Sequence, residues 1–257
     1  MQLTLEGKTK EQVAIERIRQ YAPADGSPLY VAFSGGKDSI VVLDLVRRSG
    51  IPYDAHYSVT GIDPPELVTF IKRNYPTVKF EMPIMSMWRG IEKKGLPTRM
   101  VRWCCEMLKE RGGEGRVCIM GIRAEESSRR KRTWKITQTR QVHKKGTAPK
   151  TVICPILDWT LLDVWDYIDS HNLTYCSLYD TYANRLGCVG CPMSNSKYEF
   201  THYPKIGEAW HRAAIRYWEN NQHKKLPQMF PSGEAYWQWW INGVSIKGQE
   251  NQEVMNI

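Results

Sequence analysis

Long apolar runs are absent from this chain of 257 residues, and no stretch approaches the 18 or more apolar residues that a membrane-spanning helix needs. The start, MQLTLEGKTKEQV, also lacks the basic end and apolar centre of a secretory signal. We therefore expect a soluble, cytoplasmic protein with no membrane partner. Hydrophobic residues make up 42% of the chain, which suffices for a packed core and argues against disorder along its whole length.

Cysteine is scarce. Seven cysteines are an odd number and too few for a disulfide scaffold at this length. The count favours a reducing compartment, in which cysteines serve for metal binding or chemistry.

Acidic residues are missing between residues 129 and 150, where nine of the 36 Lys and Arg residues fall. The other basic residues balance the 27 acidic ones, so this basic segment accounts for the whole net charge of +9. It is either a solvated loop or a binding surface for a polyanion, and Trp134 and His143 within it favour the polyanion. We expect nucleic acid to contact Arg129, Arg130, Lys131, Arg132, Lys135, Arg140, Lys144 and Lys145.

Apolar stretches alternate with helical patterns through the first two thirds of the chain. Strands are predicted at residues 28–33, 53–59, 78–82, 116–122 and 151–155, which implies a parallel sheet in an α/β fold of the Rossmann-like type, with helices on both faces. Five of the ten Trp residues lie between Trp210 and Trp240 and predict a helical extension. We place the domain boundary so that residues 1–195 form the main domain and residues 196–257 the extension.

Two glycines stand between the first predicted strand and the next helix, in Ser34-Gly-Gly-Lys-Asp-Ser39. Glycines there let backbone amides approach phosphate oxygens, and Lys37 adds a cation. The loop is not a Walker A motif, because Val31 and Asp38 replace its first glycine and its Ser/Thr. It resembles the SGGxDS signature of the PP-loop ATP pyrophosphatases. That resemblance implies an adenine nucleotide alpha hydrolase type of fold, cleavage of ATP between its α and β phosphates, and ATP binding by Ser34, Gly35, Gly36, Lys37, Asp38 and Ser39.

Four cysteines form two pairs, Cys104-Cys105 and Cys188-Val-Gly-Cys191, with 82 residues between the pairs. This spacing fits structural zinc poorly, whereas four thiolates from two loops can hold a four-iron four-sulfur cluster. A zinc site, a sulfur-relay site and plain packing stay open as alternatives. The remaining cysteines, Cys118, Cys154 and Cys176, are expected in the core.

Three stretches together resemble the phosphoadenylyl sulfate reductase family. They are the CC…CxxC pattern, Gly121-x-Arg123-x-x-x-Ser127-x-x-Arg130, and Pro155-Ile-Leu-Asp-Trp-Thr160 followed by Asp163-Val-Trp165. The resemblance implies a four-iron four-sulfur cluster on Cys104, Cys105, Cys188 and Cys191. It also implies nucleotide contacts from Gly121, Arg123 and Ser127, and catalytic roles for Lys37, Asp38, Arg123 and Arg130.

Two departures from the reductases bear on the reaction. The 66 residues after Cys191 contain no cysteine that could serve as the reductases' tail nucleophile, and the glycine loop keeps Lys37 and Asp38 intact. The chain therefore resembles most the ATP pyrophosphatase component of DNA phosphorothioation systems. The expected cofactors are ATP, Mg²⁺ and a 4Fe-4S cluster.

The expected partners are nucleic acid and a cysteine desulfurase as sulfur donor, and the sequence also allows a homo-oligomer. DNA is favoured over RNA, although phosphate contacts carry no information on base or sugar. A sulfonucleotide reductase, a tRNA-thiolating enzyme and a non-catalytic nucleotide-binding module are the alternatives. Glu125 and Glu126 could hold Mg²⁺, but two acids at a helix start more often cap the helix or form ion pairs.

Overall fold

The computed structural model describes residues 7–141, 148–181 and 183–243. The chain divides into two compact units, each built from separate stretches of the sequence. The division predicted after residue 195 stays a prediction. The first unit comprises Met1–Val59, Pro65–Met82 and Glu110–Gly187, and the second comprises Thr60–Pro64, Pro83–Lys109 and Cys188–Ile257.

The first unit is built, within the described ranges, on one sheet of six strands in the order β3-β2-β1-β4-β6-β5. All neighbouring strands run parallel except β5, which pairs antiparallel with β6 at the edge. The expected Rossmann-like α/β fold is thus confirmed, although an antiparallel edge strand was not expected. The strands are β1 (Leu29–Ala32), β2 (Tyr53–Ser58), β3 (Lys79–Glu81), β4 (Val117–Met120), β5 (Thr137–Arg140) and β6 (Lys150–Ile153).

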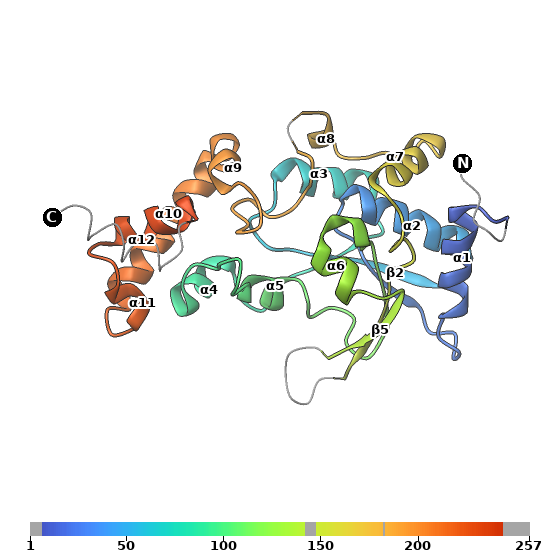
Figure 1. Ribbon diagram of the computed structural model, residues 1–257, viewed down its shortest axis with the longest axis horizontal. Coiled ribbons are helices and arrows are strands. Elements are labelled where there is room, and N and C mark those ends of the chain that lie inside the picture. The colour runs from blue at the N-terminus through green and yellow to red at the C-terminus, as the bar shows by residue number, and fades with distance from the viewer. Residues whose placement is uncertain (1–6, 142–147, 182, 244–257) are drawn as a thin grey trace. The chain divides into compact units, whose positions relative to one another are not determined.

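One face of the sheet forms the main core. Side chains alternate between the faces of a strand, so Leu29 and Val31 of β1 point into this core while Tyr30 points to the other side. Helices from four parts of the first unit contribute to the same core (Figure 1). They are α1 (Lys10–Gln20), α2 (Lys37–Ser49), α3 (Pro65–Asn74) and α7 (Leu161–Ser170).

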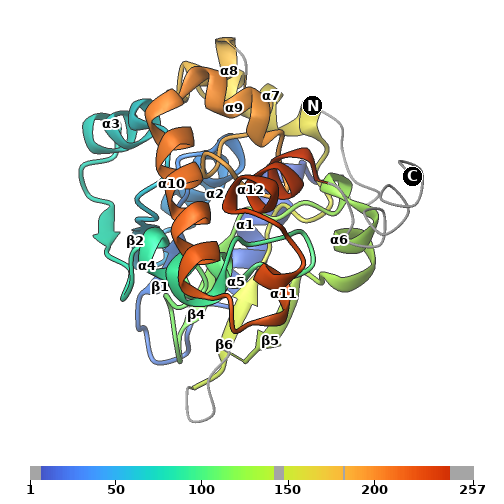
Figure 2. The same ribbon diagram turned by 90° about the vertical axis from the view of Figure 1, so that its left-hand side faces the viewer.

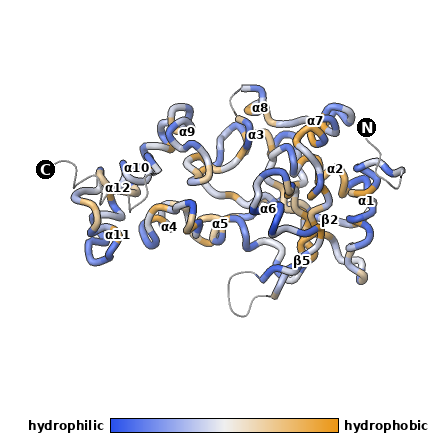
Figure 3. The backbone as a smooth tube through the Cα atoms, in the orientation of Figure 1, coloured by the Kyte–Doolittle hydropathy of each residue, from blue (hydrophilic) through white to orange (hydrophobic). Residues whose placement is uncertain are grey.

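The ends of these helices agree with the local sequence signals. Thr9 caps α1 in a capping box with Gln12, and Thr160 caps α7 in the same way with Asp163. Helix α2 ends at Gly50, whose φ of 75° is the left-handed conformation that glycine adopts without strain. Figure 3 shows apolar residues gathered in the strands and in α2, as a buried sheet requires.

The other face of the sheet is covered by residues around the short helices η1 (Ala124–Glu126) and α6 (Ser128–Thr133). Trp134 and Ile136 pack there against Tyr30 and Cys118. The basic segment is therefore ordered at its start, because α6 and β5 both belong to it. Lys150, at the end of that segment, is buried and donates to the carbonyl oxygens of Glu110 and Gly112.

The second unit is helical (Figure 2), and its core is rich in aromatic side chains. Its core contains Trp210, stacked on Trp240 with ring centroids 4.9 Å apart, and Tyr236, which is fully buried. The helices are α4 (Met87–Lys94), α5 (Trp103–Leu108), α9 (Ser196–His202), α10 (Pro204–Asn220), α11 (Lys225–Gln228) and α12 (Gly233–Asn242). A further short helix, α8 (Leu178–Thr181), belongs to the first unit.

No helix in the described part of the chain combines the length and the apolar character needed to cross a bilayer.

The packing of the second unit predicts the effect of a methyl group at Gly90, inside α4. A Cβ there would lie 2.3 Å from Cζ3 of Trp103, a buried ring whose Nε1 donates to the Gly95 carbonyl. A glycine-to-alanine change in an exposed helix stabilises by about 1 kcal/mol. Here overpacking outweighs that gain, so Gly90→Ala should lower the free energy of unfolding by about 1–2 kcal/mol.

Urea denaturation measures this difference. Gly187→Ala is the control, because nothing lies within 4 Å of its Cβ position, and it should change stability by less than about 0.5 kcal/mol. A Gly90→Ala chain as stable as the parent would contradict the packing argument.

Candidate functional site

The glycine loop (Ser34–Ser39) connects β1 to α2 at the carboxyl end of the parallel strands, where ligands bind in this class of sheet. Gly35 has a φ of 72°, and a Cβ on it would lie 2.7 Å from Cδ1 of Ile71 and 2.8 Å from Cδ1 of Leu67. Glycine is therefore required there both by the backbone conformation and by the lack of space.

Hydrogen bonds within the loop hold its shape. Ser39 Oγ donates to the Gly36 carbonyl over 2.8 Å and accepts the Ser34 N–H over 3.2 Å. No side chain caps α2 at Gly36, so its first amides stay available to a ligand or to a group from elsewhere. The Lys37 N–H donates to Tyr179 Oη, 3.0 Å away.

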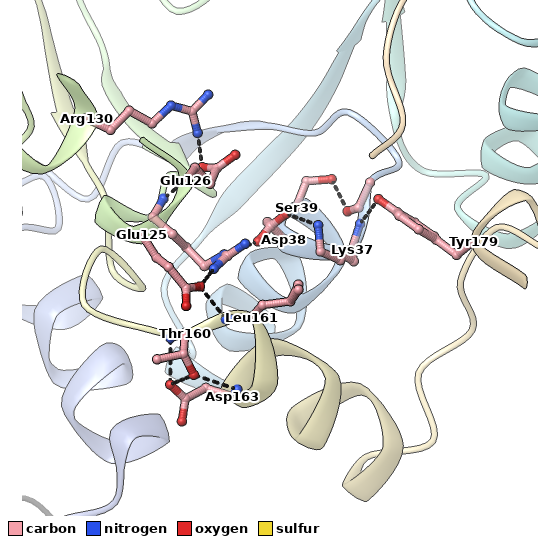
Figure 4. A network of polar contacts seen from close by, with 12 residues as sticks. Lys37, Asp38, Ser39, Glu125, Glu126, Arg130, Thr160, Leu161, Asp163 and Tyr179 are labelled. Carbon is pink, nitrogen blue, oxygen red and sulfur yellow. Dashed lines mark hydrogen bonds and ion pairs between the residues drawn. The ribbon is translucent and has the colours of Figure 1, made fainter. Parts of the chain in front are cut away.

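Two nearly buried cations flank one carboxylate beside this loop. The Lys37 ammonium lies 3.1 Å from Asp38 Oδ2, and Arg123 Nε donates to Asp38 Oδ1 over 2.6 Å (Figure 4). Residue exposure is only 5% for Lys37 and 4% for Arg123. The structure thus brings together three of the four predicted catalytic side chains.

Arg123 also links this cluster to the next elements of the chain. Its guanidinium donates to Glu125 Oε2 over 2.5 Å, and the same oxygen accepts the Leu161 N–H at the start of α7. Glu126 pairs with Arg130 and accepts the Arg123 N–H (Figure 4). Both glutamates therefore form ion pairs, the alternative to Mg²⁺ binding that the sequence favoured.

The other predicted nucleotide residues on this side have backbone roles. A Cβ on Gly121 would lie 2.8 Å from the carbonyl oxygen of Asp38, so glycine lets β4 run directly against the start of α2. Ser127 caps α6, its Oγ accepting the Arg130 N–H over 3.2 Å. Arg130, the fourth predicted catalytic residue, forms an ion pair with Glu126.

The predicted nucleic-acid residues follow this site on the same unit. Arg140 lies over the Trp134 ring at 4.2 Å from its centroid, a cation–π contact. Lys144 and Lys145 lie outside the described residues. Exposed side chains are found at Arg129, Lys131, Arg132, Lys135 and Arg140.

The four paired cysteines all belong to the second unit. A hydrogen bond with Cys105 raises the pKa of Cys104, and burial and the nearby Cys188 and Cys191 raise it further. Burial raises the pKa of Cys188 to about 11, and its thiol donates to Thr60 Oγ1 over 3.6 Å. The two pairs are thus close enough in space to influence each other's protonation.

A cation accompanies these thiols. Desolvation would lower the pKa of Lys109, but the neighbouring Cys188 and Asp63 raise it above its ordinary value. A positive charge beside a thiol favours the thiolate, which is the form that binds metal or attacks sulfur.

The loop from Cys188 to Cys191 is held by residues that follow it in the sequence. Glu199 Oε2 accepts the Gly190 N–H over 2.7 Å. Trp210 Nε1 donates to the Val189 carbonyl over 3.2 Å. Gly190 has a φ of 78° and packs so tightly against Trp210 that a Cβ would lie 2.7 Å from Nε1.

The donor chemistry of the four thiols fits an iron-sulfur cluster, because thiolates are its usual protein ligands. Among the residues that the structure describes, however, no three His, Cys, Asp or Glu side chains are arranged to hold a metal ion. The remaining cysteines, Cys118, Cys154 and Cys176, are buried in the core of the first unit.

Sequence reasoning missed Tyr179, Lys109 and Glu199. Lys109 follows Cys105 by four residues, one helical turn, and that spacing could have singled it out. No local signal marks Tyr179 or Glu199, since each reaches its loop through tertiary packing.

Comparison with known proteins places the chain in a family. The model of the phosphoadenosine phosphosulfate reductase domain matches residues 28–194. An uncharacterized protein of Methanocaldococcus jannaschii is 30% identical over 230 residues, which cover 82% of this chain and 46% of that protein. The chain therefore spans about half the length of this relative.

Two further proteins are similar to this chain, one in sequence and one in structure. An adenosine 5'-phosphosulfate reductase of Shouchella clausii is 29% identical over 198 residues, covering 72% of this chain and 79% of the reductase. The structure of Candida glabrata FMN adenylyltransferase with FAD and inorganic pyrophosphate is similar in fold, with a TM-score of 0.50 and 16% identity, over 70% of this chain and 62% of that chain. By the match to its domain model, the chain belongs to the phosphoadenosine phosphosulfate reductase domain family.

Proposed function

We propose that the chain is an ATP pyrophosphatase that adenylates a nucleic-acid phosphate so that sulfur can replace one of its oxygens. We expect DNA rather than RNA as the acceptor. One observation carries the proposal. The arginine that pairs with Asp38 at the glycine loop, Arg123, stands directly before η1, and α6, the next helix, bears exposed basic residues. The proposed ATP site and this basic surface therefore lie on one continuous piece of the first unit.

The adenylation step follows from the charges at the loop. An oxygen of the acceptor phosphate forms a bond to the α phosphorus of ATP, the bond from that phosphorus to the bridging oxygen breaks, and pyrophosphate leaves with the bond electrons. Negative charge then builds on the leaving pyrophosphate, and Lys37 and Arg123 are placed to stabilise it. Asp38 would hold Mg²⁺, which neutralises phosphate charge when bound.

A nucleic acid fits the basic surface better than a small nucleotide does. A mononucleotide needs only a few cations, whereas α6 and β5 place exposed basic side chains along the segment that follows the site. Adenylation also makes the acceptor oxygen part of a good leaving group, AMP, whereas an unmodified phosphate oxygen leaves poorly. A cysteine desulfurase is the expected sulfur donor.

The paired cysteines of the second unit are assigned to sulfur handling. Cys104, Cys105, Cys188 and Cys191 would hold a 4Fe-4S cluster, which supplies a site for binding sulfur or passing electrons. Burial raises the pKa of Cys188, and the positive charge of the nearby Lys109 opposes that rise. The Cys188 thiol also donates to Thr60, and Glu199 fixes the backbone of its loop.

Sulfonucleotide reduction is the second candidate. It is favoured by the relative named as an adenosine 5'-phosphosulfate reductase, which matches over 72% of this chain. A reductase needs no ATP, so the two candidates differ in whether ATP is cleaved.

The first prediction concerns ATP cleavage. With duplex DNA present, the chain should exchange labelled pyrophosphate into ATP, and Lys37→Ala should reduce that rate about 100-fold, because a charge that stabilises the leaving group is lost. Lys72→Ala, an exposed lysine on α3, is the control and should retain the rate. Sulfite release from a sulfonucleotide without any exchange would instead establish the reductase.

The second prediction concerns the thiol loop. Anaerobically purified protein should be brown and contain iron and sulfide, and Cys188→Ser should be colourless. Glu199→Ala should lose most of the iron and speed alkylation of Cys191, because the Gly190 N–H within this loop loses its acceptor. Glu199→Gln keeps an acceptor oxygen and should retain more iron.

Glu208→Ala, an exposed carboxylate on α10, is the control for this series. Stoichiometric zinc in a colourless preparation would refute the cluster. Equal iron content in Glu199→Ala and the parent would refute the role of Glu199.

The third prediction concerns the basic surface. Replacing Arg129, Lys131 and Arg132 with Gln should weaken duplex DNA binding and reduce the slope of log K against log salt by roughly 3, since each lost phosphate contact contributes about 0.9. The same replacement of Lys205, Arg212 and Arg216 on α10 removes equal charge elsewhere and should leave the slope unchanged. Equal effects of the two triple variants would show that net charge alone governs binding.

A further inference from the structure

The hydroxyl of Tyr179 lies at the mouth of the glycine loop, although the residue is far from the loop in sequence. It accepts the Lys37 N–H over 3.0 Å, and its ring lies 5.5 Å from the Lys37 ammonium (Figure 4). The Lys37 amide stands at the start of α2, where backbone N–H groups bind phosphate oxygens, and here Tyr179 already accepts its hydrogen. Tyr179 therefore occupies part of the space that a phosphate would approach.

This hydroxyl accepts one hydrogen bond and keeps its own proton. Oη accepts the backbone N–H of Lys37, which uses one of the two lone pairs of a hydroxyl oxygen. Its own proton is then left to donate. Within the part of the chain that the structure describes, no oxygen accepts it.

The surroundings keep this hydroxyl in place. The Tyr179 ring packs edge-on against Trp165, with centroids 5.4 Å apart, and Leu178 beside it is buried in the main core. Burial raises the pKa of Tyr179 to about 12, so the proton stays on the oxygen at neutral pH. Tyr179 is thus a fixed side chain rather than a mobile lid.

Gly36 leaves the hydroxyl open toward the loop. A Cβ at Gly36 would lie 3.3 Å from Tyr179 Oη and 3.4 Å from Ser34 Oγ. A methyl group there would crowd the hydroxyl, whereas hydrogen leaves the space next to the Lys37 amide free. Gly36, the second glycine of the loop, thus leaves room for the Tyr179 hydroxyl as well as for the turn of the backbone.

We infer that Tyr179 donates its hydroxyl proton to a phosphate oxygen of the nucleotide bound on Gly36 and Lys37. The side chain then has two functions: it orients the first amide of α2 and adds a neutral donor beside the Lys37 cation. This assignment rests on the proposed binding of ATP at the glycine loop. It extends the phosphate site to a residue that lies about 140 positions away from that loop.

The test measures binding of inorganic pyrophosphate and of adenosine by calorimetry. Tyr179→Phe keeps the ring and its packing but loses the donor, so it should weaken pyrophosphate binding about tenfold, the usual effect of losing a hydrogen bond to a charged group. Adenosine binding, which involves no phosphate, should change by less than about twofold on the same grounds. Tyr175→Phe is the matched control, because the Tyr175 hydroxyl donates to Asp180 and not to the loop.

The outcomes are distinguishable. Unchanged or tighter pyrophosphate binding by Tyr179→Phe would overturn the assignment, and tighter binding would mean that the hydroxyl blocks the site. Equal weakening of pyrophosphate and adenosine binding would also overturn it, because that pattern indicates general damage. If the parent chain binds neither ATP nor pyrophosphate, the proposed function itself fails.

Discussion

The candidate site depends on one carboxylate held between two buried cations. Asp38 pairs with Lys37 on its own helix and with Arg123 from the end of β4, so it ties the glycine loop to the neighbouring strand. Removing this carboxylate takes from the nearly buried Lys37 its carboxylate partner, and breaking such a buried pair costs about 3–5 kcal/mol. An arriving polyphosphate offers the same cations a second source of negative charge, and the site can therefore exchange an internal partner for a ligand.

This constraint also explains why small residues surround the pair. Asp38 can meet Arg123 only if β4 and α2 approach closely, and Gly121 permits that approach because any side chain would strike the Asp38 carbonyl. Gly35 lets the loop lie flat on Ile71 and Leu67 for the same reason. The glycines are thus explained by contact distances, and the charges they bring together account for the chemistry.

Local sequence signals predicted most of the first unit. The five parallel strands lie at the predicted ranges, because their apolar patterns depend on neighbours in sequence. The antiparallel strand β5 escaped prediction because its run Thr-Gln-Thr-Arg carries no apolar alternation and it pairs only through β6. Glu199 and Tyr179 escaped for a related reason, since only the folded chain brings them to their loops.

The structure also gives a reason for the aromatic extension. The matched family domain ends at residue 194, just after the Cys188–Cys191 loop, yet the groups that hold this loop are Glu199 on α9 and Trp210 on α10. Trp210 is fully buried and stacked on Trp240 of α12, so the position of its Nε1 is set by the packing of the aromatic core. The backbone that presents Cys188 and Cys191 is therefore shaped by residues beyond the family domain. A packed aromatic layer suits this task, because a rigid ring can fix a single carbonyl without placing a competing charge beside the thiols.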